Sequence, residues 1–218
     1  KYVPDTESTP AGQGYWLEDR GWVKDNPDND KDYNATLASK GLNNATMPFK
    51  LVNKKKNKFW VSQTDYAERK VGSSASNEHP SFENKKISEG FVYSNRLGFL
   101  SEENIILSES NSFDKPNFYF QSARAITDAD PIDLNVSSLR PAKLHAVIPQ
   151  AQGLILFSEF EQFVMFSDDG FISPTTVQIR SIAKYQNDVD ITPVDVGTQI
   201  YFVNKTPGYT KAMAMNTK

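Results

Sequence analysis

Short apolar runs and polar turns alternate along most of this chain. Residues 95–110, NRLGFLSEENIILSES, contain one apolar run at 97–100, then Glu-Glu-Asn, then a second apolar run at 105–107. Each run has the length of a strand and is rich in residues that suit a pleated, half-buried surface. The pattern therefore predicts a tight β-hairpin.

The same unit recurs twice further along the chain. Gly98, Gly153 and Gly197 each begin a series of glycine, apolar strand, polar turn and second apolar strand, at intervals of 55 and 44 residues. A spacing of about 40 to 50 residues is typical of β-propeller blades and too long for ankyrin or leucine-rich repeats. Further strand candidates at 118–120, 132–136, 175–182 and 191–196 would complete four-stranded sheets.

The first part of the chain is richer in loop-forming residues. Residues 1–46 contain several Gly and Pro and the run DNPDNDKD, which favours turns. Residues 14–25 predict two short strands with a bend at Gly21, and residues 47–63 predict a hairpin. The lysines at 54–56 would form its solvated turn, which we favour over a phosphate-binding patch. We expect a β-rich, loop-containing region at 1–80 and blade-like sheets at 81–218.

One segment has a pattern that would suit a short helix. Residues 137–148, SSLRPAKLHAVI, place Leu139, Leu144 and Val147 on a partial apolar stripe, with Pro141 in the first turn. The predicted fold class is thus mainly β: antiparallel sheets that resemble the blades of an incomplete β-propeller, with at most this one helix.

Composition excludes several classes of protein. The 218 residues include no cysteine, so disulfides and thiolate metal sites are excluded. The balance of 24 basic and 27 acidic residues gives a net charge of −3, which argues against a dedicated nucleic-acid-binding surface that neutralises many phosphates. No window approaches the roughly 18 apolar residues of a membrane helix. Because the sequence starts with Lys1 and ends in a strand-like run, we expect a fragment of a longer polypeptide.

Candidate chemistry is sparse. Adjacent carboxylates at 102–103 and 168–169 lie at predicted hairpin tips, where neighbouring side chains point apart, so they do not suit the facing pair of a glycosidase. His79 and His145 are 66 positions apart and lack metal-ligand spacing. No GxSxG nucleophile motif occurs. We therefore predict no catalytic residue, no cofactor and no metal site.

Four phenylalanines recur every third position, at Phe157, Phe160, Phe163 and Phe166. This spacing would suit a helix face or a platform for stacking bases. The flanking Leu-Ile-Leu and Val-Met residues instead favour two buried strands, so we predict that these rings pack in a core.

Six motifs occur in a recognisable order between residues 47 and 203. They are MPFKLV, DYAERKVGSSASNEHPSF, VYSNRLGFLSEENIILSES, DADPIDLNVSS, KLHAVIPQAQGLILFSEFEQFVM and TPVDVGTQIYFV. The series resembles the tail tubular protein B family, the nozzle subunit of short-tailed, podovirus-type bacteriophages. The first 46 residues resemble it only through GYWLE and the following loop.

The resemblance implies a structural, non-enzymatic component of a virion tail. It implies a hexameric ring below the portal and adaptor that continues the channel for DNA ejection and helps to anchor tail fibres. Such a protein would be assembled in the bacterial host cytoplasm and would not insert into a membrane. The net acidic charge suits transient, non-specific passage of DNA, because few phosphates would be held.

The residues that we single out are structural. Arg96 lies directly before an apolar run, where its planar guanidinium could bind carboxylates or carbonyls between blades and fix their angle. Arg69 and Lys70 are similar interface candidates. For each of the three, a solvated surface charge is the alternative.

Two competing functions stay open at this point. The first is a carbohydrate-binding or glycan-hydrolysing tail module, with Trp16, Trp22 and Trp60 as sugar platforms. The second is a non-viral β-propeller scaffold that would close its ring of blades within one longer chain.

Overall fold

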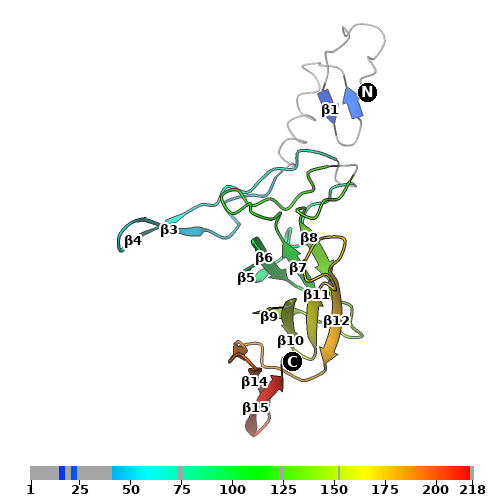
Figure 1. Cartoon of the computed structure of the whole chain (residues 1–218). Helices are drawn as coiled ribbons and strands as arrows, with labels where there is room; N and C mark the ends of the chain where they lie inside the picture. The colour runs from blue at the N-terminus through cyan, green and yellow to red at the C-terminus, as the bar shows by residue number, and fades with distance from the viewer. Residues whose placement is uncertain are drawn as a thin grey trace. The chain divides into compact units, whose positions relative to one another are not determined.

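All regular elements in the described part of the chain are β-strands (Figure 1). The computed structural model describes residues 41–72, 76–122, 125–151 and 153–216, together with the backbone of two short strands before them. The strands are β1 (Tyr15–Leu17), β2 (Gly21–Val23), β3 (Lys50–Lys55), β4 (Lys58–Ser62), β5 (Ile87–Tyr93), β6 (Arg96–Ser101), β7 (Asn104–Leu107), β8 (Ile132–Asn135), β9 (Leu144–Gln150), β10 (Gly153–Ser158), β11 (Gln162–Phe166), β12 (Gln178–Ala183), β13 (Val194–Asp195), β14 (Gln199–Thr206) and β15 (Tyr209–Asn216). The prediction of a mainly β chain of antiparallel sheets is confirmed.

The chain divides into two compact units. The first unit covers Lys1–His79 and Tyr119–Ala125, and the second covers Pro80–Phe118 and Ile126–Lys218. The first contains the hairpins β1–β2 and β3–β4, and the second contains three antiparallel sheets. The predicted division into functional regions at residue 80 stays a prediction.

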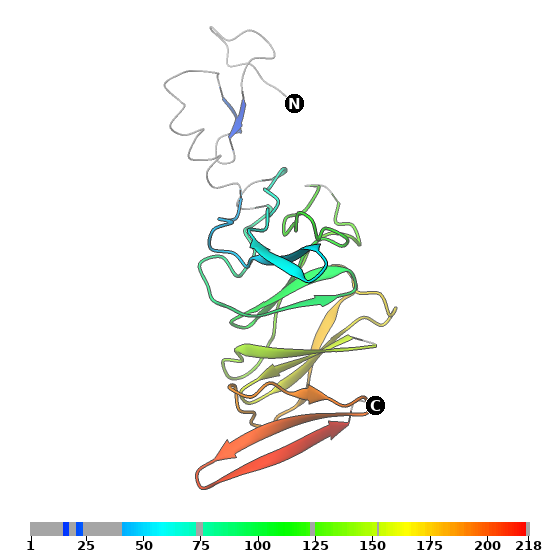
Figure 2. The same ribbon diagram turned by 90° about the vertical axis from the view of Figure 1, so that its left-hand side faces the viewer.

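The second unit is built from strands that pair with their neighbours in the chain. Its sheets have the orders β5-β6-β7-β8, β12-β11-β10-β9 and β13-β14-β15, with every pair antiparallel. Figure 2 shows the three sheets stacked face to face. The described sheets do not close into a barrel.

The predicted hairpins are present. The apolar runs of residues 95–110 are β6 and β7, joined by the two residues Glu102 and Glu103. Glu102 has a φ of 51°, the left-handed conformation that two-residue hairpin turns require. The other predicted hairpins are β3–β4, β10–β11 and β14–β15.

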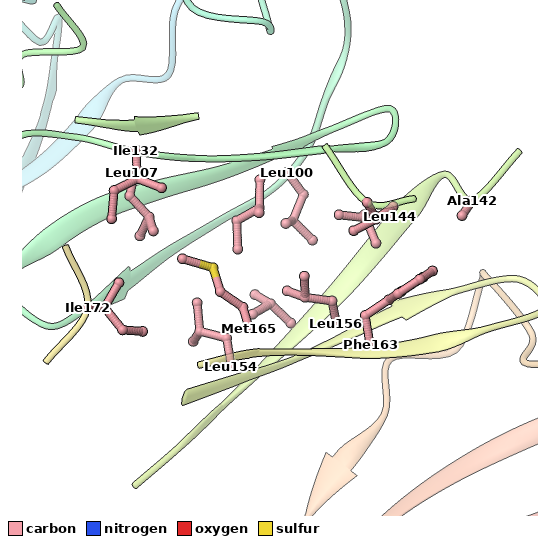
Figure 3. Close-up of a cluster of buried hydrophobic side chains, with 13 residues drawn as sticks. Leu100, Leu107, Ile132, Ala142, Leu144, Leu154, Leu156, Phe163, Met165 and Ile172 are labelled. Carbon is pink, nitrogen blue, oxygen red and sulfur yellow. The ribbon is translucent and has the colours of Figure 1, made fainter. Parts of the chain in front are cut away.

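The first hydrophobic core of the second unit lies between the sheet β5–β8 and the sheet β9–β12. Figure 3 shows Leu100, Leu107 and Ile132 of one sheet facing Leu154 and Met165 of the other. All five side chains are buried. The packing of these two apolar faces stabilises the stack, because each buried aliphatic side chain contributes roughly 1.5–3 kcal/mol.

The second core lies on the opposite face of the central sheet. Ile155 and Phe157 of β10 pack there with Ile200 and Phe202 of β14. The central sheet is therefore buried on both faces, which explains why β10, GLILFS, is buried at all six positions and lacks a polar residue at every second one.

A β-bulge in β9 allows this strand to place side chains in both cores. Ser158 pairs with Leu144 and Phe157 pairs with Ala146, so that His145 is the extra residue. As a result, Leu144 packs in the first core and Ala146 in the second, although only one residue separates them.

The predicted helix at 137–148 is wrong. Residues 144–150 form β9, and residues 137–143 have no regular structure. The strand β9 forms backbone hydrogen bonds with β10, and its side chains are buried on both faces. A short helix with Pro141 in its first turn would gain less from propensity and packing than this strand does.

The predicted strand at 118–120 is also absent. The side-chain amide of Asn77 donates to the carbonyl of Phe120 at 3.0 Å and accepts from its N–H at 3.0 Å, so a side chain replaces a strand partner. Phe118 packs instead against the rings of Phe82 and Phe99. The candidate strand at 191–196 is reduced to the two residues of β13, whereas those at 132–136 and 175–182 are present as β8 and β12.

We expect Gly153→Ala to destabilise the second unit. A Cβ at this position would lie 2.2 Å from the carbonyl oxygen of Met165, which is backbone of the paired strand β11. Relief of this clash requires movement of the strand, so we expect a loss of about 1–3 kcal/mol in the free energy of unfolding. Urea unfolding followed by circular dichroism measures it. Gly90→Ala in β5, whose Cβ would meet its nearest atom at 3.4 Å, is the matched control, and equal losses would contradict the argument.

Candidate functional site

Arg96, the first residue of β6, is the largest fully buried side chain among the described residues, with 1% of its surface exposed. Its guanidinium donates to four backbone carbonyls: those of Ser108 at 2.8 Å, Asp128 at 2.5 Å, Ala129 at 3.1 Å and Asp130 at 2.7 Å. One planar side chain thereby ties the start of β6 to the end of β7 and to the loop before β8.

The charge of Arg96 is balanced by its surroundings. Burial lowers the pKa of Arg96, and the carboxylates of Asp130, Glu109 and Asp128 act in the opposite direction. The Asp130 carboxylate also accepts from the N–H of Thr127 at 2.7 Å, which fixes the loop that supplies the carbonyls. A buried charge held in this way strongly restricts the positions of its partners.

Arg69 and Lys70 lie in the first unit and differ from each other. Arg69 is buried, donates to the carbonyl of Asn77 at 2.9 Å and lies 5.9 Å from the centre of the Tyr119 ring. The Asn77 amide also donates to the carbonyl of Val71 at 2.9 Å, so Arg69 belongs to a polar network that organises loops. Lys70 is exposed. The interface role of all three residues stays a prediction.

Two adjoining hollows lie at one edge of the second unit, with volumes of about 430 and 800 Å³. They share Arg140, Pro141 and Phe160 in their walls. Phe160 lies in the β10–β11 turn, and the Arg140 guanidinium lies 5.8 Å from the centre of its ring. A cation over an aromatic face holds the two residues together at the rim.

Glu161 is a buried carboxylate in the wall of the smaller hollow. The Ser138 hydroxyl donates to it, the Ser181 hydroxyl donates to its Oε1 at 2.5 Å, and Lys184 Nζ lies 3.8 Å away. The bonds from Ser138 and Ser181 lower the pKa of Glu161, so it is ionised at neutral pH. Sequence reasoning missed this cluster, because no local motif connects residues 138, 161 and 181.

Three other carboxylates of the second unit, those of Glu89, Glu102 and Glu103, also bind groups of that unit. Glu89 is half-buried, and burial raises its pKa, yet its Oε2 accepts from the N–H of Val147 at 2.8 Å. Glu102 pairs with Lys143 at 2.5 Å, and Glu103 Oε1 accepts from the N–H of Ala142 at 3.3 Å. A general acid of a glycosidase has a raised pKa and faces a second carboxylate across a cleft. Glu161 has a lowered pKa, and the carboxylate of Glu89 is engaged with the backbone.

His145, the bulge residue of β9, lies in the wall of the larger hollow. Its Nε2 lies 3.0 Å from the side-chain nitrogen of Asn187. Burial lowers the pKa of His145, which favours the neutral ring at neutral pH. Among the described side chains, no group of three or more His, Cys, Asp or Glu is placed to hold a metal ion. The described part of the chain contains no helix that could span a membrane.

The predicted aromatic sites fall in different places. Phe157 and Phe163 are buried in the two cores, whereas Phe160 is 38% exposed at the rim of the hollows. Trp60 lies on β4 and is exposed. The side chains of Trp16 and Trp22 lie outside the described residues, so a sugar platform formed by the three tryptophans has no described geometry.

Glu161→Gln is expected to weaken the acid sensitivity of the fold. Because the folded-state pKa of Glu161 lies below the ordinary value of 4.5, its contribution is present above that pH and is lost as the pH falls through the folded-state pKa. We expect the variant to be about 1–2 kcal/mol less stable at pH 7 and closer to the parent at pH 3. Denaturant titrations at both pH values measure this. A constant difference would contradict it, and Glu159→Gln at an exposed neighbour is the control.

Comparison with known proteins gives two findings. The sequence profile of a family described as bacteriophage nozzle protein matches residues 32–218. The chain is also 32% identical over 165 residues to the tail tubular protein gp12 of Escherichia phage T7. That alignment covers 76% of this chain and 20% of the phage protein, so the chain spans about a fifth of the length of this relative.

Proposed function

The chain belongs to the bacteriophage nozzle protein family, and from this premise we propose that it is a structural part of a phage tail that contributes to the wall of the DNA-ejection conduit. The match of the family profile over residues 32–218 is the observation that carries this proposal. The tail of the virion is then its location, after assembly in the host cytoplasm.

The packing of the second unit suits a wall. Its central sheet is covered on both faces by further sheets, and the carboxylates of Glu89, Glu102 and Glu161 bind groups of the same unit. We propose that residues 81–218 form stacked, blade-like sheets and that residues 1–80 form a separate β-rich region.

We propose a hexameric ring as the assembled form, in contact with an adaptor and with tail fibres. A net charge of −3 supports a channel through which DNA passes with few phosphate contacts. The proposed role is not enzymatic. Neither the family match nor the described side chains favour the carbohydrate-binding alternative.

Electron microscopy of the protein that carries this sequence tests the proposal. We expect closed rings with sixfold symmetry, because a conduit for a duplex must surround it. Single particles that do not associate at high concentration would contradict the ring. Hydrolysis or tight binding of host-surface glycans by the same preparation would instead favour the carbohydrate alternative.

A further inference from the structure

The β3–β4 hairpin of the first unit has an exposed apolar face. The register pairs Leu51 with Val61 and Asn53 with Phe59, so Leu51, Phe59 and Val61 share one face of the strand pair. Their exposed fractions are 66%, 60% and 72%, and Phe49, two residues before Leu51, is also exposed. Monomeric proteins seldom leave such a contiguous patch open, which indicates a contact with another molecule.

The opposite face of the hairpin is less exposed and less apolar. It carries Val52 and Ser62, which are half-buried, and Lys50 and Trp60, which are exposed. Residues 49–62 also contain five lysines and no acidic residue. The partner surface must therefore have an apolar centre and carboxylates around it. A DNA duplex would match the lysines but would leave Leu51 and Val61 without apolar partners, so the side chains favour a protein.

The second unit of the same chain contains a segment with these kinds of side chain. Residues 188–196, DVDITPVDV, connect β12 to β14 and contain three aspartates and no basic residue. The exposed apolar side chains in this segment are Val189, Ile191, Val194 and Val196. The second unit as a whole has 16 acidic and 11 basic residues, so its charge is opposite to that of the hairpin.

We propose that the β3–β4 hairpin of one copy docks on residues 188–196 of a second copy. The inference rests on the proposed function, since it supplies the contact between neighbouring subunits of a ring. Because the two surfaces differ, the contact is heterologous, and repeated heterologous contacts close into rings when their rotation permits. The lysines and aspartates would guide the orientation of the two copies, and the apolar side chains would be buried between them.

The expected contact is weak for a single pair of copies. Four apolar side chains and their rim bury less surface than the roughly 1,200 Å² of a stable complex, so two free copies should associate only transiently. In a closed ring every subunit is held by two neighbours, and the second contact then forms within one assembly, which raises its effective concentration.

Cross-linking in this cysteine-free chain tests the contact directly. One preparation carries Val61→Cys, the other carries Val194→Cys, and a short bis-maleimide is added to each alone and to their mixture. We expect the mixture to give about tenfold more cross-linked dimer than either variant alone. Val92→Cys, at an exposed valine of β5, replaces Val61→Cys as the matched control and should give only background. Equal self-linking of Val61→Cys would indicate a face-to-face contact and overturn the proposal.

Charge reversal provides the second test. The combined change Lys54→Glu, Lys55→Glu and Lys56→Glu should lower the cross-linking yield about tenfold. The combined change Asp188→Lys, Asp190→Lys and Asp195→Lys in the other copy should restore it. Loss of DNA binding with an unchanged yield would identify a nucleic-acid arm and overturn the inference. Normal rings formed by hairpin variants would overturn it and leave the proposed function intact. Cross-linked pairs without any closed ring would instead contradict the proposed function.

Discussion

Arg96→Met is expected to lower the free energy of unfolding of the second unit by about 3–5 kcal/mol. The substitution keeps most of the side-chain volume but removes the donors for four carbonyl groups, at Ser108 and in the loop 128–130. A buried carbonyl that loses its donor keeps the desolvation penalty of the folded state without the bond that compensates it. The same change leaves the carboxylates near Arg96 without their cation.

Guanidinium chloride unfolding followed by circular dichroism measures the loss. Arg180→Met is the matched control, because Arg180 is exposed and makes a single described contact of 4.7 Å with the centre of the Phe166 ring. We expect a loss of under about 1 kcal/mol there. Arg96→Lys should be intermediate, since an ammonium has three donors and no planar fork. Equal losses for Arg96→Met and Arg180→Met would show that the buried bonds contribute little.

The hairpins could be predicted from the sequence because their signal is local. A polar turn between two apolar runs is complete within about 15 residues, and β6–β7, β10–β11 and β14–β15 all follow it. The order of such motifs also carried the resemblance to the nozzle family, which the family match over residues 32–218 confirms.

The errors arose where distant partners decide the structure. Leu144 and Val147 fit a helical stripe, but β10 supplies strand partners for this segment and two cores bury it. The strand predicted at 118–120 is replaced by bonds from Asn77, 43 residues earlier in the chain. Periodicity within one segment contains no information about either partner.

The candidate sites show the same limit. The acceptors of Arg96 are 12 to 34 residues away, so the sequence identified the arginine and not its partners. The hydroxyl groups around Glu161 come from Ser138 and Ser181, which no spacing rule connects. The apolar face of β3–β4 had a local signal in the apolar residues at every second position around the lysines, but only the strand register and the exposed fractions show which side chains share that face and how open it is.

Phe157→Ala is expected to destabilise the second unit by about 3–5 kcal/mol, and Phe160→Ala by under about 1 kcal/mol. The two residues are three positions apart in the same phenylalanine series. Phe157 has 0% of its surface exposed and packs 5.7 Å from the ring of Phe202 on β14, whereas Phe160 lies in the turn at the rim of the hollows. Truncation of Phe157 leaves a cavity between the second and third sheets, and truncation of Phe160 leaves none.

Hydrogen exchange shows which strands are destabilised, in addition to how large the loss of stability is. Because Phe157 belongs to the core shared with Ile200 and Phe202, its loss should speed exchange in β14 and β15 more than in β6 and β7, which are packed by the first core. Phe163→Ala supplies the reciprocal control, since Phe163 is equally buried but belongs to the first core. If Phe157→Ala and Phe163→Ala accelerated exchange in the same strands to the same degree, the two cores would unfold as one, and the stack could not be described as separable sheets held by successive interfaces.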